Sequence, residues 1–395
     1  MAGVMLPPAA WRNHAGLARL VDALGRGTAR IVGGAVRDTL LGIETADVDL
    51  ATTHSPQEVV ALLEAARIKA VPTGIEHGTI TAVSSDEVYE VTTLRRDVTT
   101  DGRRATVAFT DDWREDAARR DFTINALYAD PATGEIYDYF GGIADLEARR
   151  IRFIGDPFKR IAEDHLRILR FFRFLARFGD APDPEGLEAC TERANDLMAL
   201  SRERIANELL RLLVAPRAVE VVGLMIERGI FVPVLPEITD AARLTALAAR
   251  EADAGIAPDP IRRLAALIPT DATVAANVGA RLKLSNKQRQ RLESATQPAD
   301  AAPRPLAYRL GADFAIDRLL LADGDAAAIR DWMPPRLPLS GGQLVARGLK
   351  AGPDVASTLR KVEDRWIAEG FPDGARVGTI ADEEVAQALD ATRNA

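Results

Sequence analysis

The stretch that decides the fold runs from residue 31 to residue 50 and reads IVGGAVRDTLLGIETADVDL. It places Gly33 and Gly34 between a short apolar run and a short helical segment. A Gly-Gly turn lets the backbone approach a phosphate closely, and the helix N-terminus behind it presents free N–H groups. Asp47 and Asp49 follow at a spacing of two, which in a strand points both carboxylates to the same side. Such a combination is typical of Mg²⁺-dependent phosphoryl or nucleotidyl transfer.

Length and composition restrict the class of protein. The chain has 395 residues, of which 47% are hydrophobic and 27% charged, and its formal net charge is −8. This length predicts two to four domains or subdomains, and the composition is that of a globular protein. We expect no membrane span, no signal peptide and no disulfide, because long apolar runs are missing and Cys190 is the single cysteine; the default location is cytoplasmic. With this negative charge, nucleic acid would have to bind to local arginine patches.

The order of predicted elements indicates an α+β head followed by helices. The head should carry a small, mostly antiparallel or mixed sheet, and its predicted elements are helix 11–26, strand 29–32, helix 36–41, strand 48–51, helix 56–67 and a hairpin of 79–84 with 88–94. The polar, glycine-containing segment 95–112 predicts a mobile loop. From about residue 156 onward, apolar residues at three- and four-residue spacing predict helices only.

The paired aspartates predict a metal site. Two adjacent carboxylates repel each other, and a cation offsets this repulsion. The alternative is an ordinary strand end with surface aspartates, but the glycines and Arg37 upstream favour catalysis by two Mg²⁺ ions bound by Asp47 and Asp49, one activating a 3′-hydroxyl and one holding a triphosphate. Glu90, on the later strand, is the candidate third catalytic carboxylate. An exposed strand glutamate without a role fits the sequence equally well.

A second motif, ARRDFTINAL at residues 118–127, pairs two arginines with an acid and an amide. The fork of an arginine suits a phosphate, and a short acid suits vicinal hydroxyls. This favours Arg120 as a triphosphate contact and Asp121 and Asn125 as ribose contacts. The simple alternative is a basic helix end that leads into a buried apolar segment.

A third motif, IAEDHLRILRFFRFLAR at residues 161–177, predicts one amphipathic helix. On that helix Asp164 and Arg167 would be neighbours at i,i+3, and a plain salt bridge is the simple interpretation. In a sharper interpretation the pair replaces a pairing base: the acid accepts from an exocyclic amino group and the arginine donates to the adjacent ring atom. Cytosine and adenine offer this combination, whereas uracil and guanine leave polar groups unpaired at about 1–3 kcal/mol each.

Together these motifs resemble the class II tRNA nucleotidyltransferase (CCA-adding enzyme) and poly(A) polymerase family. The matching segments, in the expected order, are GGAVRD at 33–38, DVD at 47–49, RRDFTINA at 119–126, EDHLRILR at 163–170 and SRERIANEL at 201–209. They extend from about residue 31 to residue 213, just over half of the chain. Beyond that point the sequence diverges, so tRNA contacts cannot be transferred.

The resemblance implies a fold and a set of site residues. It implies a polymerase-β-like nucleotidyltransferase head at 1–150, a helical neck that recognises the base at 151–220, a helical body at 221–300 and a helical, tRNA-binding tail at 301–395. It implies Mg²⁺ on Asp47 and Asp49. The nucleotide-binding residues are expected to be Gly33, Gly34, Arg37, Arg120, Asp121, Asn125, Asp164, Arg167, Arg170 and Arg173.

The resemblance implies an activity: template-independent addition or repair of the 3′-terminal CCA of tRNA from CTP and ATP, with release of pyrophosphate. Three alternatives stay open. They are a poly(A) polymerase, a partial enzyme that adds only CC or only A, and a nucleotide- or RNA-binding module without activity. The basic stretch 281–291 is a candidate tRNA backbone contact, although a solvated helix face is the simpler interpretation. The sequence does not give the oligomeric state.

Overall fold

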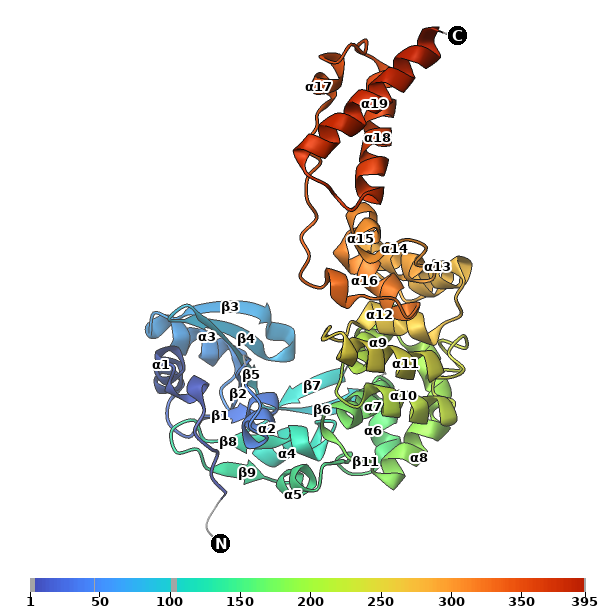
Figure 1. Cartoon of the computed structure of the whole chain (residues 1–395). Coiled ribbons are helices and arrows are strands. Elements are labelled where there is room, and N and C mark those ends of the chain that lie inside the picture. The colour runs from blue at the N-terminus through green and yellow to red at the C-terminus, as the bar shows by residue number, and fades with distance from the viewer. Residues whose placement is uncertain (1–3, 46, 101–104, 394–395) are drawn as a thin grey trace. The chain divides into compact units, whose positions relative to one another are not determined.

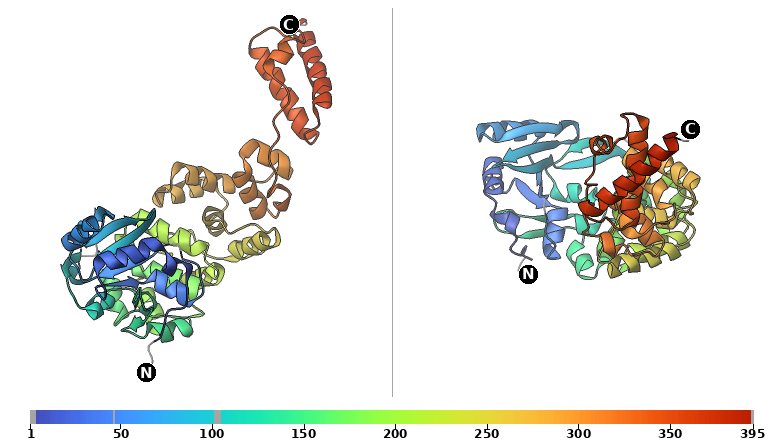
Figure 2. Two further views of the ribbon diagram at one scale, coloured as in Figure 1. Left: turned by 90° about the vertical axis from the view of Figure 1, so that its left-hand side faces the viewer. Right: turned by 45° about the horizontal axis from the view of Figure 1, so that its top comes forward.

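The computed structural model describes residues 4–45, 47–100 and 105–393, which form two compact units, Met1–Ile238 and Thr239–Ala395. The α+β fold class is confirmed, with strands and helices in the first unit and helices in the described part of the second (Figures 1 and 2). Within the described residues, no helix has the length and apolar character to cross a membrane. The division into head, neck, body and tail at residues 150, 220 and 300 stays a prediction.

The first unit is built on a seven-stranded mixed sheet with the strand order β3-β4-β5-β2-β1-β8-β9 (Figure 1). Every pairing is antiparallel except β2 with β5, which is parallel. The strands are β1 (Ala29–Val32), β2 (Asp49–Thr52), β3 (Lys69–Gly74), β4 (Thr79–Ser84), β5 (Glu87–Thr93), β8 (Leu127–Ala129) and β9 (Ile136–Asp138). The parallel pair matters for the site because it brings Asp49 opposite Glu90 in the register.

Helices α1 (Ala15–Leu24) and α3 (Pro56–Ala65) pack against each other and against β4. The first predicted helix, 11–26, is shorter than expected, because residues 10–13 form a 3₁₀ turn and Gly25, with a φ of 90°, ends α1. α3 begins as the sequence predicts. The Ser55 side chain accepts from the Glu58 backbone N–H, and the Glu58 carboxylate accepts from the Ser55 backbone N–H. This reciprocal capping satisfies two N–H groups at the helix start.

The prediction of a mobile loop at 95–112 is wrong for most of that segment. Strands β6 (Arg95–Thr100) and β7 (Ala105–Phe109) form an antiparallel hairpin that is separate from the main sheet. The β-branched residues in RRDVTT and ATVAF favour strands, but the charged residues around them led to the prediction of a loop. Asp112 then caps α4 (Trp113–Ala118), the helix that carries the chain towards the two motif arginines.

The predicted single helix at 161–177 is also wrong. α6 (Pro157–Glu163) ends at Asp164, whose backbone is extended, and α7 (Arg167–Phe178) begins three residues later. The Asp164 side chain accepts from the Leu166 backbone N–H at 3.1 Å, a local bond that competes with a continuous helix. Asp164 and Arg167 therefore lie on either side of a helix break, and not on one helix face.

The remaining elements of the first unit surround α7. Short helices α5 (Gly142–Glu147) and α8 (Pro184–Glu192), the small parallel pair β10 (Arg150–Ile151) with β11 (Ala181–Pro182), and helices α9 (Arg202–Leu213) and α10 (Ala218–Glu227) complete it. α7 packs against α9 and α10. Phe171 and Phe172 on α7 are fully buried, and Phe171 stacks on Phe153 with ring centroids 5.6 Å apart. This aromatic core fixes the helix that projects arginines into the site.

The described part of the second unit is made of helices and their connections. Its α-helices are α11 (Ala242–Asp253), α12 (Pro260–Leu267), α13 (Ala272–Arg281), α14 (Asn286–Ala295), α15 (Pro303–Leu310), α16 (Ala312–Leu321), α17 (Gly341–Val345), α18 (Pro353–Ala368) and α19 (Gly374–Arg393). Trp366 is buried at the centre of a cluster formed by α17, α18 and α19. The basic stretch 281–291 does not form one helix, because it spans the end of α13 and the start of α14.

Candidate active site

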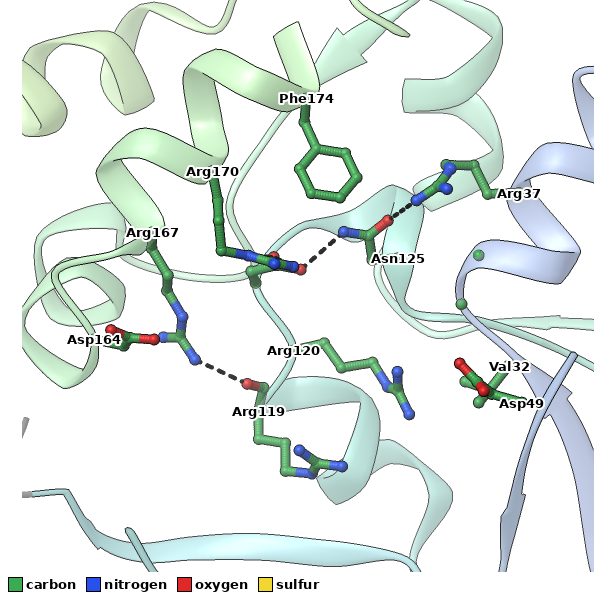
Figure 3. A pocket seen from close by; sticks show the side chains of 13 residues that line it. Val32, Arg37, Asp49, Arg119, Arg120, Asn125, Asp164, Arg167, Arg170 and Phe174 are labelled. Atoms are coloured by element: carbon green, nitrogen blue, oxygen red, sulfur yellow. Dashed lines mark hydrogen bonds and ion pairs between the residues drawn. The ribbon is translucent and has the colours of Figure 1, made fainter. Parts of the chain in front are cut away.

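A pocket of about 380 Å³ lies within the first unit, between the glycine turn of the head and α7 (Figure 3). This volume is in the range of small-molecule sites. Its lining consists of Val32, Gly33, Gly34, Arg37, Asp49, Arg119, Arg120, Asp121, Asn125, Asp164, Arg167, Arg170 and Phe174. Segments far apart in the sequence thus meet at one polar cavity, which carries five arginines and three aspartates.

The glycine turn forms one wall of the pocket. Gly33 has a φ of 69°, a conformation that glycine adopts without strain, and α2 (Gly34–Leu40) begins immediately after it. Arg37 on α2 is buried, and burial lowers the pKa of its guanidinium. The guanidinium is held by Asp38 at 2.7 Å, and its Nη1 donates to Asn125 Oδ1 at 2.5 Å. Arg37 is therefore a fixed cation at the edge of the cavity.

The acidic side of the pocket is formed by Asp49 at the start of β2. Asp47 lies just before the strand and is exposed. We expected both aspartates to belong to one strand, but only Asp49 is part of β2. Burial raises the pKa of Asp49 to about 6, although part of its side chain stays in contact with solvent. The charges of Glu90 and Asp47 contribute to this rise in the pKa, whereas the charge of Arg120 opposes it.

This donor set fits a divalent cation by its chemistry. Three hard carboxylates repel one another here, and this repulsion adds to the effect of burial on the pKa of Asp49; a bound cation would offset the repulsion. Among the residues that the structure describes, no three His, Cys, Asp or Glu side chains are arranged closely enough to surround a metal ion. Asp49 and Asp47 are the residues that could hold one, and Glu90, the neighbour of Asp49 in the parallel register, adds negative charge beside them.

The two arginines of the second motif are held by one buried acid, Asp116 on α4. Arg119 Nε donates to Asp116 Oδ1 at 2.8 Å, and Arg120 Nη2 donates to Oδ2 at 3.1 Å. Burial alone would raise the pKa of Asp116, but the charges of Arg120 and Arg119 and the hydrogen bond from Tyr128 lower it to about 2. The acid is therefore ionised at neutral pH, and both arginines face the pocket.

Asp121 and Asn125 line the pocket and also connect it internally. Asp121 Oδ2 accepts from Arg170 Nε at 2.7 Å, and its Oδ1 accepts from Asn125 Nδ2 at 2.9 Å. Burial raises the pKa of Asp121, but the charge of Arg170 and the hydrogen bonds outweigh burial and lower it overall. Since Asn125 accepts from Arg37 in turn, a continuous chain of hydrogen bonds links α2 to α7 across the pocket (Figure 3).

The predicted base-reading pair reaches the pocket with each member held by a different partner. Asp164 Oδ2 accepts from Arg204 Nη2 of α9 at 2.8 Å. Arg167 Nη1 donates to Glu163 Oε2 at 2.5 Å, and its Nη2 donates to the Arg119 carbonyl at 3.1 Å. The plain salt bridge between Asp164 and Arg167 is therefore not the interaction that orients them; two separate ion pairs do so.

Most of the predicted nucleotide residues meet at the pocket, and three predicted site residues do not. The three are Asp47, Glu90 and Arg173; the structure describes them, but they do not line the pocket. Arg173 pairs instead with Glu208 of α9 at 2.5 Å. The sequence reasoning missed Val32, Arg119 and Phe174 as lining residues. Phe174 lies one helical turn after Arg170, and Arg119 directly precedes Arg120. Their positions in the motifs could therefore have predicted both as lining residues.

The fold and the pocket define a class of protein, the nucleotidyltransferases that place a glycine turn beside a carboxylate at the start of an adjacent strand. Family models agree. Residues 29–152 match the poly A polymerase head domain, and residues 181–242 match a model described as a probable RNA and SrmB-binding site of polymerase A.

Whole-chain comparisons identify the family. The chain is 35% identical over 368 residues to the mitochondrial CCA tRNA nucleotidyltransferase 1 of Mus musculus, covering 87% of this chain and 83% of that protein. It is 46% identical over 187 residues to the CCA-adding enzyme of Levilactobacillus brevis, covering 47% of this chain and 46% of that enzyme. The Bacillus stearothermophilus CCA-adding enzyme, solved with CTP, superposes with a TM-score of 0.69 at 25% identity, covering 96% of this chain and 97% of that one. The chain therefore belongs to the tRNA nucleotidyltransferase and poly(A) polymerase family, as its motifs predicted, and is a nucleotidyltransferase.

Proposed function

We propose that this chain adds or repairs the 3′-terminal CCA of tRNA from CTP and ATP without a nucleic-acid template. The observation that carries this proposal is the composition of one pocket. Arginines suited to a triphosphate, the carboxylate of Asp49 and the Asp164–Arg167 pair suited to a cytosine or adenine edge all line it. Transfer chemistry and base choice therefore share a single cavity.

In this proposal the nucleotide lies with its triphosphate towards Arg37 and Arg120 and its base towards Asp164 and Arg167. The tRNA 3′-hydroxyl attacks the α-phosphate in line, a new phosphodiester bond forms, and the bond to the β-phosphate breaks with pyrophosphate as leaving group. Arg120, whose charge is balanced by Asp116, stabilises the negative charge that develops on the phosphates. Asp121 and Asn125 are proposed to orient the ribose.

A divalent ion, which we propose to be Mg²⁺, would be held by Asp47 and Asp49 and would stabilise charge on the transferring phosphoryl group. Glu90 is proposed to strengthen the negative field at this position, since it neighbours Asp49 in the sheet register. A cation at this place would offset the charges of Glu90 and Asp47, which contribute to the raised pKa of Asp49, and would favour the ionised carboxylate.

The test is incorporation into tRNA that lacks its 3′ end, with each nucleoside triphosphate offered singly and then in pairs. We expect CMP addition from CTP, AMP addition only after two C residues, and no UMP or GMP addition. Long A tails would instead establish a poly(A) polymerase, and addition that stops after CC or needs preformed CC would establish a partial enzyme. Complete inactivity with retained CTP binding would refute the enzymatic proposal.

Localisation in the cytoplasm stays a prediction. The vertebrate relatives from Mus musculus, Homo sapiens and Danio rerio carry names that place them in mitochondria. Fractionation of cells of the source organism, with antibody detection of the chain, would test the prediction.

A further inference from the structure

Asp116 is a buried acid beside the pocket whose carboxylate accepts four hydrogen bonds, and the sequence motifs described above did not single it out. It lies on α4, and 1% of its surface is exposed. Its Oδ1 accepts from Arg119 Nε at 2.8 Å and from the Arg95 backbone N–H at 3.2 Å. Its Oδ2 accepts from Tyr128 Oη–H at 2.6 Å and from Arg120 Nη2 at 3.1 Å. The two oxygens thus serve four donors from three segments of the head.

We infer that Asp116 is a positioning residue for nucleotidyl transfer, which orients Arg120 and Arg119 towards the triphosphate. This inference rests on the proposed function, because it takes Arg120 as a triphosphate contact. Asp116 does not line the pocket, whereas both arginines do. Its effect on the nucleotide therefore passes through them.

The geometry explains why an arginine at this place needs such an anchor. Arg120 has a long side chain with many rotamers, and immobilising it on nucleotide binding costs conformational entropy. Asp116 and Tyr128 fix its Nη2 and Nε beforehand, at 3.1 Å each, and leave Nη1 free of both these contacts. Nη1 lies 3.6 Å from the place that a Cβ on Gly33 would occupy, so it faces the glycine turn.

The same carboxylate anchors the first residue of the β6–β7 hairpin through the Arg95 backbone N–H. A carboxylate suits this arrangement because it only accepts hydrogen bonds, and all four partners donate. An amide in its place would turn an N–H₂ group towards donors, so the Asp116→Asn change removes the charge and mismatches at least one partner while it conserves size.

The experiment compares the affinity of full-length variants for CTP and for cytidine monophosphate by calorimetry in the presence of Mg²⁺. The ratio of the two affinities isolates the contribution of the terminal phosphates. Arg120→Met should lower this ratio about 10- to 100-fold, and Asp116→Asn about tenfold. The double variant should lose less than the product of the two single effects, because both changes act on the guanidinium of Arg120.

Glu115→Gln is the matched control. Glu115 is the neighbour of Asp116 on α4, and it bonds to Thr110 and not to the motif arginines. We expect this variant to keep the wild-type affinity ratio. A general loosening of α4 would lower the affinities for CTP and the monophosphate alike and would leave their ratio unchanged.

The outcomes separate the inference from the proposed function. An unchanged ratio in Arg120→Met would refute the role of Arg120 and with it the proposed nucleotide orientation. A lowered ratio in Arg120→Met with an unchanged ratio in folded Asp116→Asn would overturn the positioning role alone. If Asp116→Asn fails to fold, Tyr128→Phe takes its place, since it removes one donor from Asp116 and the acceptor of Arg120 Nε; a ratio lowered about threefold or more supports the inference, and a wild-type ratio overturns it.

Discussion

Two groups of charged residues, one in each unit, use the same side chains for different purposes. The pocket cluster comprises the charged lining residues of the first unit: Arg37, Asp49, Arg119, Arg120, Asp121, Asp164, Arg167 and Arg170. The body network of the second unit comprises Glu251, Asp259, Arg262, Arg263, Arg291 and Asp317. In the first group the arginines keep a face towards a cavity. In the second, Glu251, Arg262 and Asp317 are at most 2% exposed.

The body network joins four helices. Arg263 pairs with Glu251 at 2.8 Å between α12 and α11, and Arg291 on α14 pairs with Asp317 of α16 at 2.5 Å and with Asp259 at 2.8 Å. Each charge is matched by another charge of the protein, so the network holds helices together and offers its groups to nothing else. The comparison teaches that arginine and aspartate content does not reveal function. The feature that reveals function is whether one side of the charged cluster stays open to a ligand.

The largest expected effect comes from the pocket cluster. Asp49→Asn should lower the rate of CMP addition about a thousandfold, because it removes the charge that is proposed to hold the divalent ion. The midpoint of thermal unfolding should stay within a few degrees of the wild type, since Asp49 repels its acidic neighbours and its loss relieves that repulsion. Steady-state incorporation and calorimetry measure the two quantities. Asp22→Asn, on the exposed side of α1, is the control.

The body network should respond in the opposite way. Asp317→Asn removes the bidentate partner of the part-buried Arg291 and the negative charge beside the buried Arg262. It should lower the free energy of unfolding of the second unit by about 3–5 kcal/mol, because the buried cation is left without a full counter-charge. Affinity for CTP should not change. The control is Asp313→Asn, one turn earlier on α16, whose exposed pair with Lys287 at 4.0 Å contributes about 0–1 kcal/mol. Equal losses of stability in the two variants would break the comparison.

Acid should weaken the anchor of the pocket arginines within a defined pH range. The pKa of Asp116 is lowered from 3.8 to about 2 in the folded chain. A depressed carboxyl pKa stabilises the fold above the unfolded value and loses this contribution as the pH falls from about 4 to about 2, a difference of about 2 kcal/mol. The stability difference between wild type and Asp116→Asn should therefore be larger at pH 6 than at pH 2.5, by denaturant titration. A difference that grows on acidification would contradict this assignment.

The smallest expected effect concerns base choice. Arg167→Ala should reduce the preference for CTP over UTP about tenfold, while the contribution of the triphosphate to binding stays the same. Arg177→Ala, on the same helix with a half-exposed side chain 3.8 Å from Asp38, is the matched control and should leave the preference unchanged. Competition between labelled CTP and UTP in a single incorporation reaction gives the ratio. An unchanged preference in Arg167→Ala would refute base reading by this arginine.

The sequence predicted helix starts and strand bounds in the head well where they depend on neighbouring residues alone. Ser55-Pro56 predicted the start of α3, and the strand at residues 29–32 was predicted with its observed bounds. The break at Asp164 was not predicted, because the apolar period of α7 continues through the preceding residues and hides the competing side-chain bond to Leu166. The β6–β7 hairpin was missed because a charged sequence resembles a loop until its two strands pair.

The sequence motifs determined the family and ten of the thirteen residues that line the pocket, because each motif is a short stretch whose chemistry is visible locally. Only the tertiary structure decided which partner holds each group. Asp116 holds Arg120, Arg204 holds Asp164, and Asp317 is buried while Asp313, four residues away, is exposed. The physical reason is that the effect of a charge depends on its burial and on the groups within a few ångströms, and these come from segments that the order of residues does not bring together.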